Sequence, residues 1–68
     1  MKSIYDVQQY LKTYGTIIYT GDRIGDLELM KSELQEIYQS QLIEKKDLES
    51  AVFILNQKIQ DLKEEREK

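Results

Sequence analysis

Apolar residues near the start of the sequence recur at the spacing of one helical face. The four positions are Ile4, Val7, Leu11 and Tyr14. Because they are three or four residues apart, they lie on one side of an α-helix. Ser3 can accept a hydrogen bond from the amide of Asp6 at the helix start, and Gly15 is suited to the left-handed conformation that ends a helix. The pattern predicts a helix over residues 4–14.

Residues 15–22 interrupt this helical pattern. Their sequence, Gly-Thr-Ile-Ile-Tyr-Thr-Gly-Asp, places β-branched and aromatic residues between two glycines. This composition favours an extended path for the backbone. Ile17 and Ile18 are both strongly apolar, so we expect at least one of them to cover the core.

Two further helical stripes follow this loop. The first predicts a helix over residues 22–40 with Asp22 as its N-cap, although Gly25 and Asp26 also allow a later start. The second predicts a helix over residues 45–63. Residues 64–68 contain no apolar side chain and are expected to fray. The stripes consist of Leu27, Met30, Leu34 and Ile37, flanked by Ile24 and Tyr38, and of Leu48, Val52, Leu55, Ile59 and Leu62.

The two stripes match each other if the chain turns back at residues 42–43. Each apolar residue of one helix then faces an apolar residue of the other. The prediction is a single domain of residues 1–68 with an all-α fold. It is a compact three-helix bundle, in which the helix 2–helix 3 antiparallel hairpin is covered by helix 1. A long coiled coil is the rival fold, but the short helices and short loops favour the bundle.

The composition removes much catalytic chemistry, because the 68 residues include no Cys and no His. The chain therefore has no thiol nucleophile, imidazole base, structural zinc site or disulfide. A calcium loop starting at Asp22 also fails, because Ile24 and Leu27 occupy the positions that need an oxygen ligand and a glycine. We expect a non-enzymatic protein with no catalytic residue, no metal site and no cofactor, and we identify no small-molecule substrate.

The distribution of hydrophobic residues also bears on where the protein is found. The sequence has no apolar run of the length that a signal peptide or a membrane span needs. The absence of Cys gives no indication of an oxidising compartment. We expect a cytoplasmic protein that does not associate with membranes.

Charge and tyrosine are unevenly distributed along the chain. The net charge is −3, but three basic and two acidic side chains give residues 1–23 a net charge of +1, which leaves −4 for residues 24–68. Four of the five tyrosines also lie in residues 1–23. Aromatic side chains interleaved with cations and hydroxyls are typical of surfaces that bind single-stranded nucleic acid. The acidic balance of the whole chain and its few basic residues argue against this function.

The third predicted helix offers a second surface. At about 100° per residue, Phe53 lies about 150° from the centre of the apolar stripe. Its neighbours there include Gln57 and Gln60, and an outward aromatic side chain among amides is typical of a protein–protein contact or a homodimer interface. In the alternative interpretation, the first helix or the following loop covers Phe53, which is then part of the core.

Four segments of the sequence stand out together: Tyr5-Asp-Val-Gln-Gln9, Lys12-Thr-Tyr-Gly-Thr16, Ile18-Tyr-Thr-Gly-Asp-Arg23 and Ser40-Gln-Leu-Ile43. With these segments the sequence resembles the YqgQ-like family of small bacterial proteins of unknown function. The resemblance extends over residues 4–62 and implies a three-helix bundle without catalytic activity or cofactor. It also implies binding of single-stranded DNA or RNA. The residues that carry this motif are Tyr5, Lys12, Tyr14, Tyr19 and Arg23.

Overall fold

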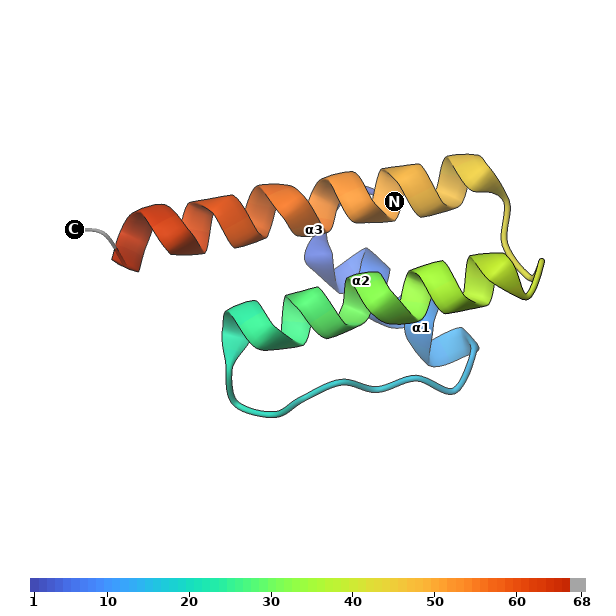
Figure 1. The fold of residues 1–68 in the computed structure, drawn as a ribbon, viewed down its shortest axis with the longest axis horizontal. Coiled ribbons are helices and arrows are strands. Elements are labelled where there is room, and N and C mark those ends of the chain that lie inside the picture. The colour runs from blue at the N-terminus through green and yellow to red at the C-terminus, as the bar shows by residue number, and fades with distance from the viewer. Residues whose placement is uncertain (67–68) are drawn as a thin grey trace.

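A computed structural model describes residues 1–66 and contains three α-helices. They are α1 (Ile4–Thr13), α2 (Arg23–Gln39) and α3 (Lys45–Arg66) (Figure 1). No strand occurs within residues 1–66. The predicted all-α three-helix bundle is therefore confirmed.

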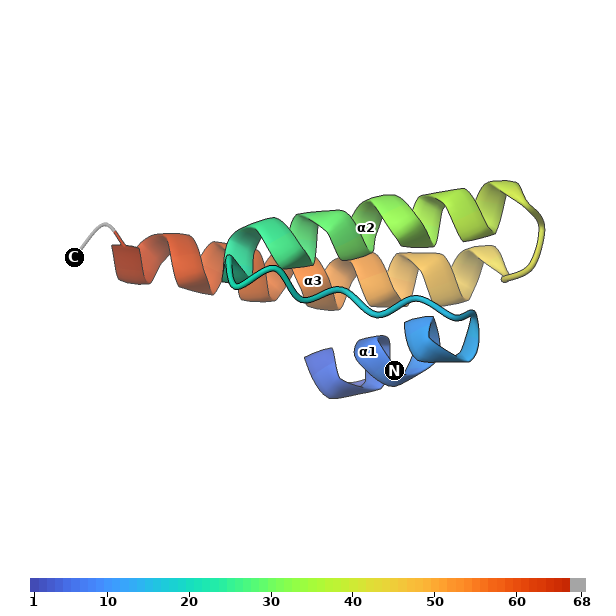
Figure 2. The same ribbon diagram turned by 90° about the horizontal axis from the view of Figure 1, so that it is seen from below.

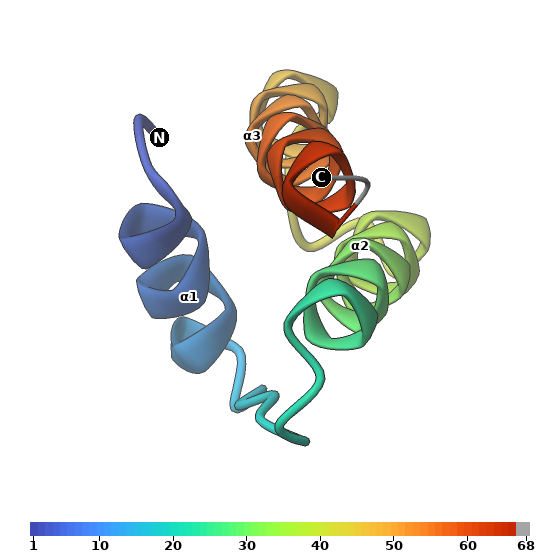
Figure 3. The ribbon, with the colours of Figure 1, turned by 90° about the vertical axis from the view of Figure 1, so that its left-hand side faces the viewer.

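α2 and α3 lie side by side in an antiparallel hairpin, which forms the largest interface of the fold (Figure 1). α1 packs on one face of this hairpin and contacts α3. The loop of residues 14–22 turns back beside α1 and runs between α1 and α2 to the start of α2 (Figures 2 and 3).

The core lies between the hairpin and α1. Val7, Leu34 and Leu55 are completely buried, one from each helix. Two residues of the predicted α3 stripe, Leu48 and Val52, are only half-buried, whereas Ala51 is completely buried. The first half of α3 therefore turns the Ala51 side toward the core. The buried apolar residues are Val7, Leu11, Leu27, Met30, Leu34, Ile37, Ile43, Ala51, Leu55, Ile59 and Leu62.

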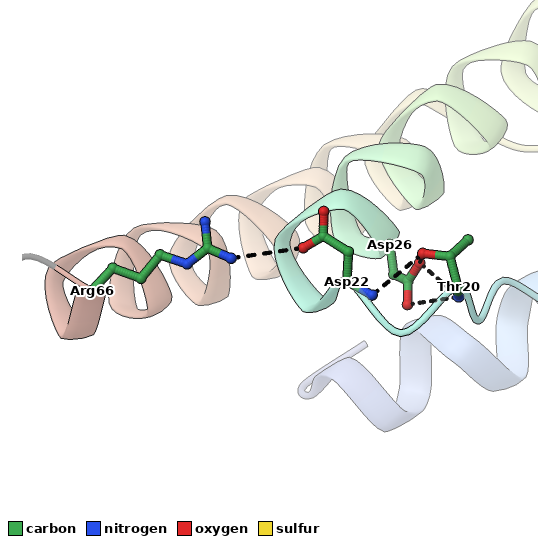
Figure 4. A network of polar contacts seen from close by, with 4 residues as sticks. All are labelled: Thr20, Asp22, Asp26 and Arg66. Carbon is green, nitrogen blue, oxygen red and sulfur yellow. Dashed lines mark hydrogen bonds and ion pairs between the residues drawn. The ribbon is translucent and has the colours of Figure 1, made fainter.

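The prediction that residues 64–68 fray is wrong for residues 64–66, which form the last turn of α3. Arg66 Nη2 lies 3.8 Å from Asp22 Oδ1 at the start of α2 (Figure 4). Basic side chains in a last helical turn also interact favourably with the helix dipole. Residues 67 and 68 of the predicted frayed tail lie outside the described residues.

The ends of α1 follow the predicted local rules. The Asp6 amide donates to Ser3 Oγ at 3.3 Å, and Gly15 has a φ of 80° after the last helical turn. The backbone amide of Lys2 also donates to Asp6 Oδ2 at 2.9 Å. This hydrogen bond is the main cause that lowers the pKa of Asp6 below its ordinary value of 3.8.

The start of α2 is held by Asp26 and not by the side chain of Asp22. Asp22 occupies the N-cap position, but its carboxylate makes no capping hydrogen bond. The buried Asp26 carboxylate instead accepts from the Thr20 amide, at 3.0 Å to Oδ1 and 3.1 Å to Oδ2, and from the Thr20 hydroxyl (Figure 4). The carboxylate therefore ties the end of the loop to the first turns of α2.

We expect Asp26→Ala to lower the free energy of unfolding by about 1–3 kcal/mol, because it removes charge-assisted hydrogen bonds and leaves the Thr20 amide without its partner. Urea unfolding followed by circular dichroism measures this change. The matched control is Glu28→Ala, which removes an exposed carboxylate of α2 and an ion pair to Lys31. Its effect is expected to stay within about 0.5 kcal/mol. Equal effects of the two variants would contradict the role given to Asp26.

Because the pKa of Asp6 is lowered, the difference in folding stability between the wild type and Asp6→Asn should depend on pH. Since the ionised form is favoured in the folded state, its stabilising contribution is complete well above 3.8 and is lost as the pH falls through the folded pKa. Thermal unfolding from about pH 7 to about pH 2 should show a wild type that is more stable at neutral pH, with a difference that vanishes in acid. A difference that is independent of pH would contradict this account.

Candidate nucleic-acid interface

A groove separates α1 from the loop that follows it. Its first part has a cavity volume of about 280 Å³. Gln8, Gln9 and Lys12 of α1 line one side, and loop residues 16–19 line the other. The buried side chains of Leu11 and Met30 also line this part of the groove. The site is therefore an open groove with an apolar lining and polar side chains from α1.

The groove continues toward the start of α2 as a second hollow of about 210 Å³. The two hollows share Gln8, Ile18, Tyr19 and Met30, so Tyr19 lies where they meet. Arg23 from α2 and Lys58 from α3 line the second of these two hollows and not the first. Three helices and the loop therefore contribute side chains to one continuous groove.

The tyrosines predicted for the interface differ in their environment. Tyr19 is 88% exposed and Tyr5 is 65% exposed. Tyr5 lines neither hollow, although it lies one helical turn before Gln9, which lines the first. Tyr14 is only 37% exposed and does not line either hollow. The structure brings Tyr19, Lys12 and Arg23 to the groove, whereas Tyr5 and Tyr14 do not line it.

Tyr14 belongs to a small aromatic contact at the end of α1. Its ring meets that of Tyr10 edge-to-face, with 5.4 Å between the ring centroids. Its hydroxyl donates to the carbonyl of Leu42 in the turn between α2 and α3 at 3.4 Å. Burial raises the pKa of Tyr10 above its ordinary value of 10, as do the nearby Tyr14 and Asp47. These contacts give Tyr14 a structural role.

Three cations surround the groove. Lys12 and Arg23 are exposed, and Lys58 is half-buried. Within residues 1–66, none of the three forms an ion pair. The sequence prediction missed Lys58, which follows Leu55 by three residues and so flanks the apolar stripe of α3. That spacing identifies a position at the edge of the core, but it does not tell which edge faces α1.

No group of three or more His, Cys, Asp and Glu side chains within residues 1–66 is placed to hold a metal ion. None of the three helices, as far as the chain is described, is long and apolar enough to cross a membrane.

The second predicted surface lies on α3, away from the groove. Phe53 is 64% exposed, so neither α1 nor the loop covers it, and its interpretation as a core residue is wrong. Phe53, Asn56, Gln57 and Gln60 line a shallow hollow of about 300 Å³ on this outer face. The two predicted surfaces are therefore formed by different residues and lie on different parts of the fold.

The fold and the groove define a small all-α protein with a solvent-open surface site. The chain belongs to the YqgQ-like family, whose family model matches residues 1–61. It is 42% identical over 67 residues to a Bacillus subtilis (strain 168) protein described as "Uncharacterized protein YqgQ". That match covers 98% of this chain and 94% of the relative. The family resemblance noted in the sequence is therefore confirmed.

The different environments of Tyr14 and Tyr19 lead to different effects on stability. We expect Tyr14→Ala to lower the free energy of unfolding by at least about 1 kcal/mol, because it removes the contact with Tyr10. Tyr19→Ala should change it by less than about 0.5 kcal/mol, because the side chain is exposed. Chemical denaturation of both variants measures the difference. A larger loss of stability in Tyr19→Ala than in Tyr14→Ala would contradict the structural role given to Tyr14.

Proposed function

We propose that this protein binds single-stranded nucleic acid weakly, without catalysis, along the groove between α1 and the following loop. The main observation in support is the position of Tyr19, an exposed ring where two hollows meet. Arg23 and Lys58 line one of these hollows, and Lys12 lines the other. Aromatic rings stack on bases, and cations contact the phosphates between them.

The size of the groove supports a short contact. Each of the two hollows, about 280 and 210 Å³, is small, and three cations of the described residues line them. Base stacking on one aromatic side chain contributes about 1–3 kcal/mol. With a net charge of −3, the protein as a whole does not attract a polyanion. These features support weak binding of a few nucleotides.

The acidic residues near the groove weaken the proposal less than their number implies. Asp26 lines the second hollow, but its carboxylate is engaged by the amide and the hydroxyl of Thr20. Most other acids lie in residues 24–68, and the exposed ones on α2 and α3 are Glu28, Glu36, Glu49, Asp61, Glu64 and Glu65. At physiological ionic strength, charges more than about 8 Å from the ligand are largely screened.

A cytoplasmic location is part of this proposal. A chain without Cys needs no oxidising compartment to fold, and the cytoplasm contains single-stranded RNA and transiently single-stranded DNA. The 2′-hydroxyl distinguishes RNA from DNA, and the polar groups of Gln8, Gln9 and Thr16 line the groove where they could meet it.

The proposal is tested by fluorescence anisotropy with labelled DNA and RNA oligonucleotides of mixed sequence. We expect weak binding that decreases about 20-fold between about 50 and about 200 mM salt, the slope for three phosphate contacts on a single strand. The DNA and RNA titrations show which nucleic acid binds more tightly. Absence of binding to both at the lower salt concentration would refute the proposal.

Variants locate the binding surface in the same assay. Tyr19→Ala should weaken binding by about 1–3 kcal/mol, and Arg23→Ala or Lys58→Gln should also reduce the salt dependence by about one phosphate contact. Lys45→Ala is the matched control, because Lys45 is an exposed cation of α3 that does not line the groove. A stronger effect of Lys45→Ala than of Arg23→Ala would place the binding surface elsewhere.

A second candidate function is a protein-interaction module that uses the outer face of α3. The exposure of Phe53 among Gln57 and Gln60 supports it, because a large exposed aromatic side chain is unfavourable in water and is enriched at interfaces. This function uses residues outside the groove, so it does not compete with nucleic-acid binding.

A further inference from the structure

The outer face of α3 has one exposed aromatic side chain among amides, and Glu49, which pairs with Lys45, lies one turn before it. Phe53 and Gln60 lie near the centre line of this face, with Lys46 toward the start of the helix and Glu64 toward its end. These last four residues are all exposed. Viewed along the bundle, α1 and α2 lie on the same side of α3, so nothing in the described chain covers the opposite side (Figure 3).

We infer that this face binds a second copy of the same chain, with the two α3 helices antiparallel and a two-fold axis passing beside Phe53. A residue next to a two-fold axis meets its own copy, so the two Phe53 rings would pack against each other. Each would then lose most of its present 64% exposure. The flanking Gln57 side chains would close the interface around the rings.

The positions of the charges favour the antiparallel arrangement. Lys46 precedes Phe53 by seven residues and Gln60 follows it by seven, so an antiparallel pair places Lys46 of one copy opposite Gln60 of the other. Glu64 lies one turn beyond Gln60 on the same helical face. Lys46 therefore meets Glu64 of the other copy, whereas a parallel pair would place like charges together. Charge complementarity thus selects both the partner and its direction.

The local contacts of these residues are compatible with the dimer. Lys46 Nζ lies 3.5 Å from Glu44 Oε2, and the Gln60 side chain donates to Glu64 Oε1 at 3.4 Å. Both contacts are on the surface, where such pairs contribute little and rearrange easily. One helical face with one aromatic anchor belongs to the small interface class, below about 1,200 Å² of total buried area. We therefore expect a weak, concentration-dependent dimer.

The chain contains no Cys, so disulfide formation between introduced thiols reports on the pairing without background. Lys46→Cys and Gln60→Cys chains are mixed in equal amounts at about 1 mM and oxidised with glutathione, and the products are separated by mass. In the antiparallel dimer, each introduced thiol faces that of the other variant. Phe53 and the second Lys46–Gln60 contact stay intact in the mixed pair.

Random pairing of two equally abundant thiols would make half of all disulfides the mixed product. We expect the mixed disulfide to form clearly more than this half. The control adds Phe53→Ser to both variants and should return the products to the random share, while circular dichroism shows an unchanged fold. A random share with Phe53 present would refute the dimer. An excess of the Gln60→Cys homodisulfide would refute the antiparallel arrangement and indicate a parallel one.

A second control separates this surface from the groove. Leu29→Cys places a thiol at an exposed apolar residue of α2, and with Gln60→Cys it should give only random pairing. An excess of that mixed disulfide would mean that α3 pairs with α2 of the other copy and not with its α3, which would refute the proposed arrangement. Phe53→Ser is expected to leave oligonucleotide binding by the monomeric chain unchanged, so the dimer and the proposed nucleic-acid function can fail independently.

Discussion

The apolar interface between α2 and α3 is the contact on which the rest of the structure depends. A chain of 68 residues without Cys forms no disulfide and has little apolar surface to bury. Each completely buried leucine, such as Leu34 or Leu55, contributes about 1.5–3 kcal/mol by its removal from water. α1 is only ten residues long and is too short to be a stable helix by itself. Its position, and that of the loop, follow from this hairpin.

Contacts of the loop with the core and with α2 fix the position of Tyr19 on the surface. Ile18 packs on the core, and Thr20 is held by the Asp26 carboxylate, so the residue between them is fixed on both sides. Side chains alternate in an extended backbone, which directs Ile18 inward and Tyr19 outward. Because the backbone around Tyr19 is already ordered, a ligand that stacks on its ring loses less conformational entropy on binding.

The groove and the outer face of α3 are separate, and this separation has a consequence for binding. A two-fold dimer through α3 would carry two grooves, so one nucleic-acid strand could contact two sets of cations. Linked sites of this kind raise the overall affinity without any new type of contact. Weak self-association and weak binding of a polyanion are physically compatible, because the two surfaces are formed by different residues.

Local sequence patterns determined the three helices, the cap at Ser3, the turn at Gly15 and the position of Phe53 opposite the apolar stripe of its helix. These features depend on residues a few positions apart, and the periodicity of a helix reveals them. Tertiary contacts decided the rest: that Asp26 and not Asp22 holds the start of α2, that Lys58 reaches the groove, and that α3 continues to Arg66. Each of these brings together residues from different elements. The period of a stripe does not specify which neighbour packs on its edge, and that choice is made by the fold.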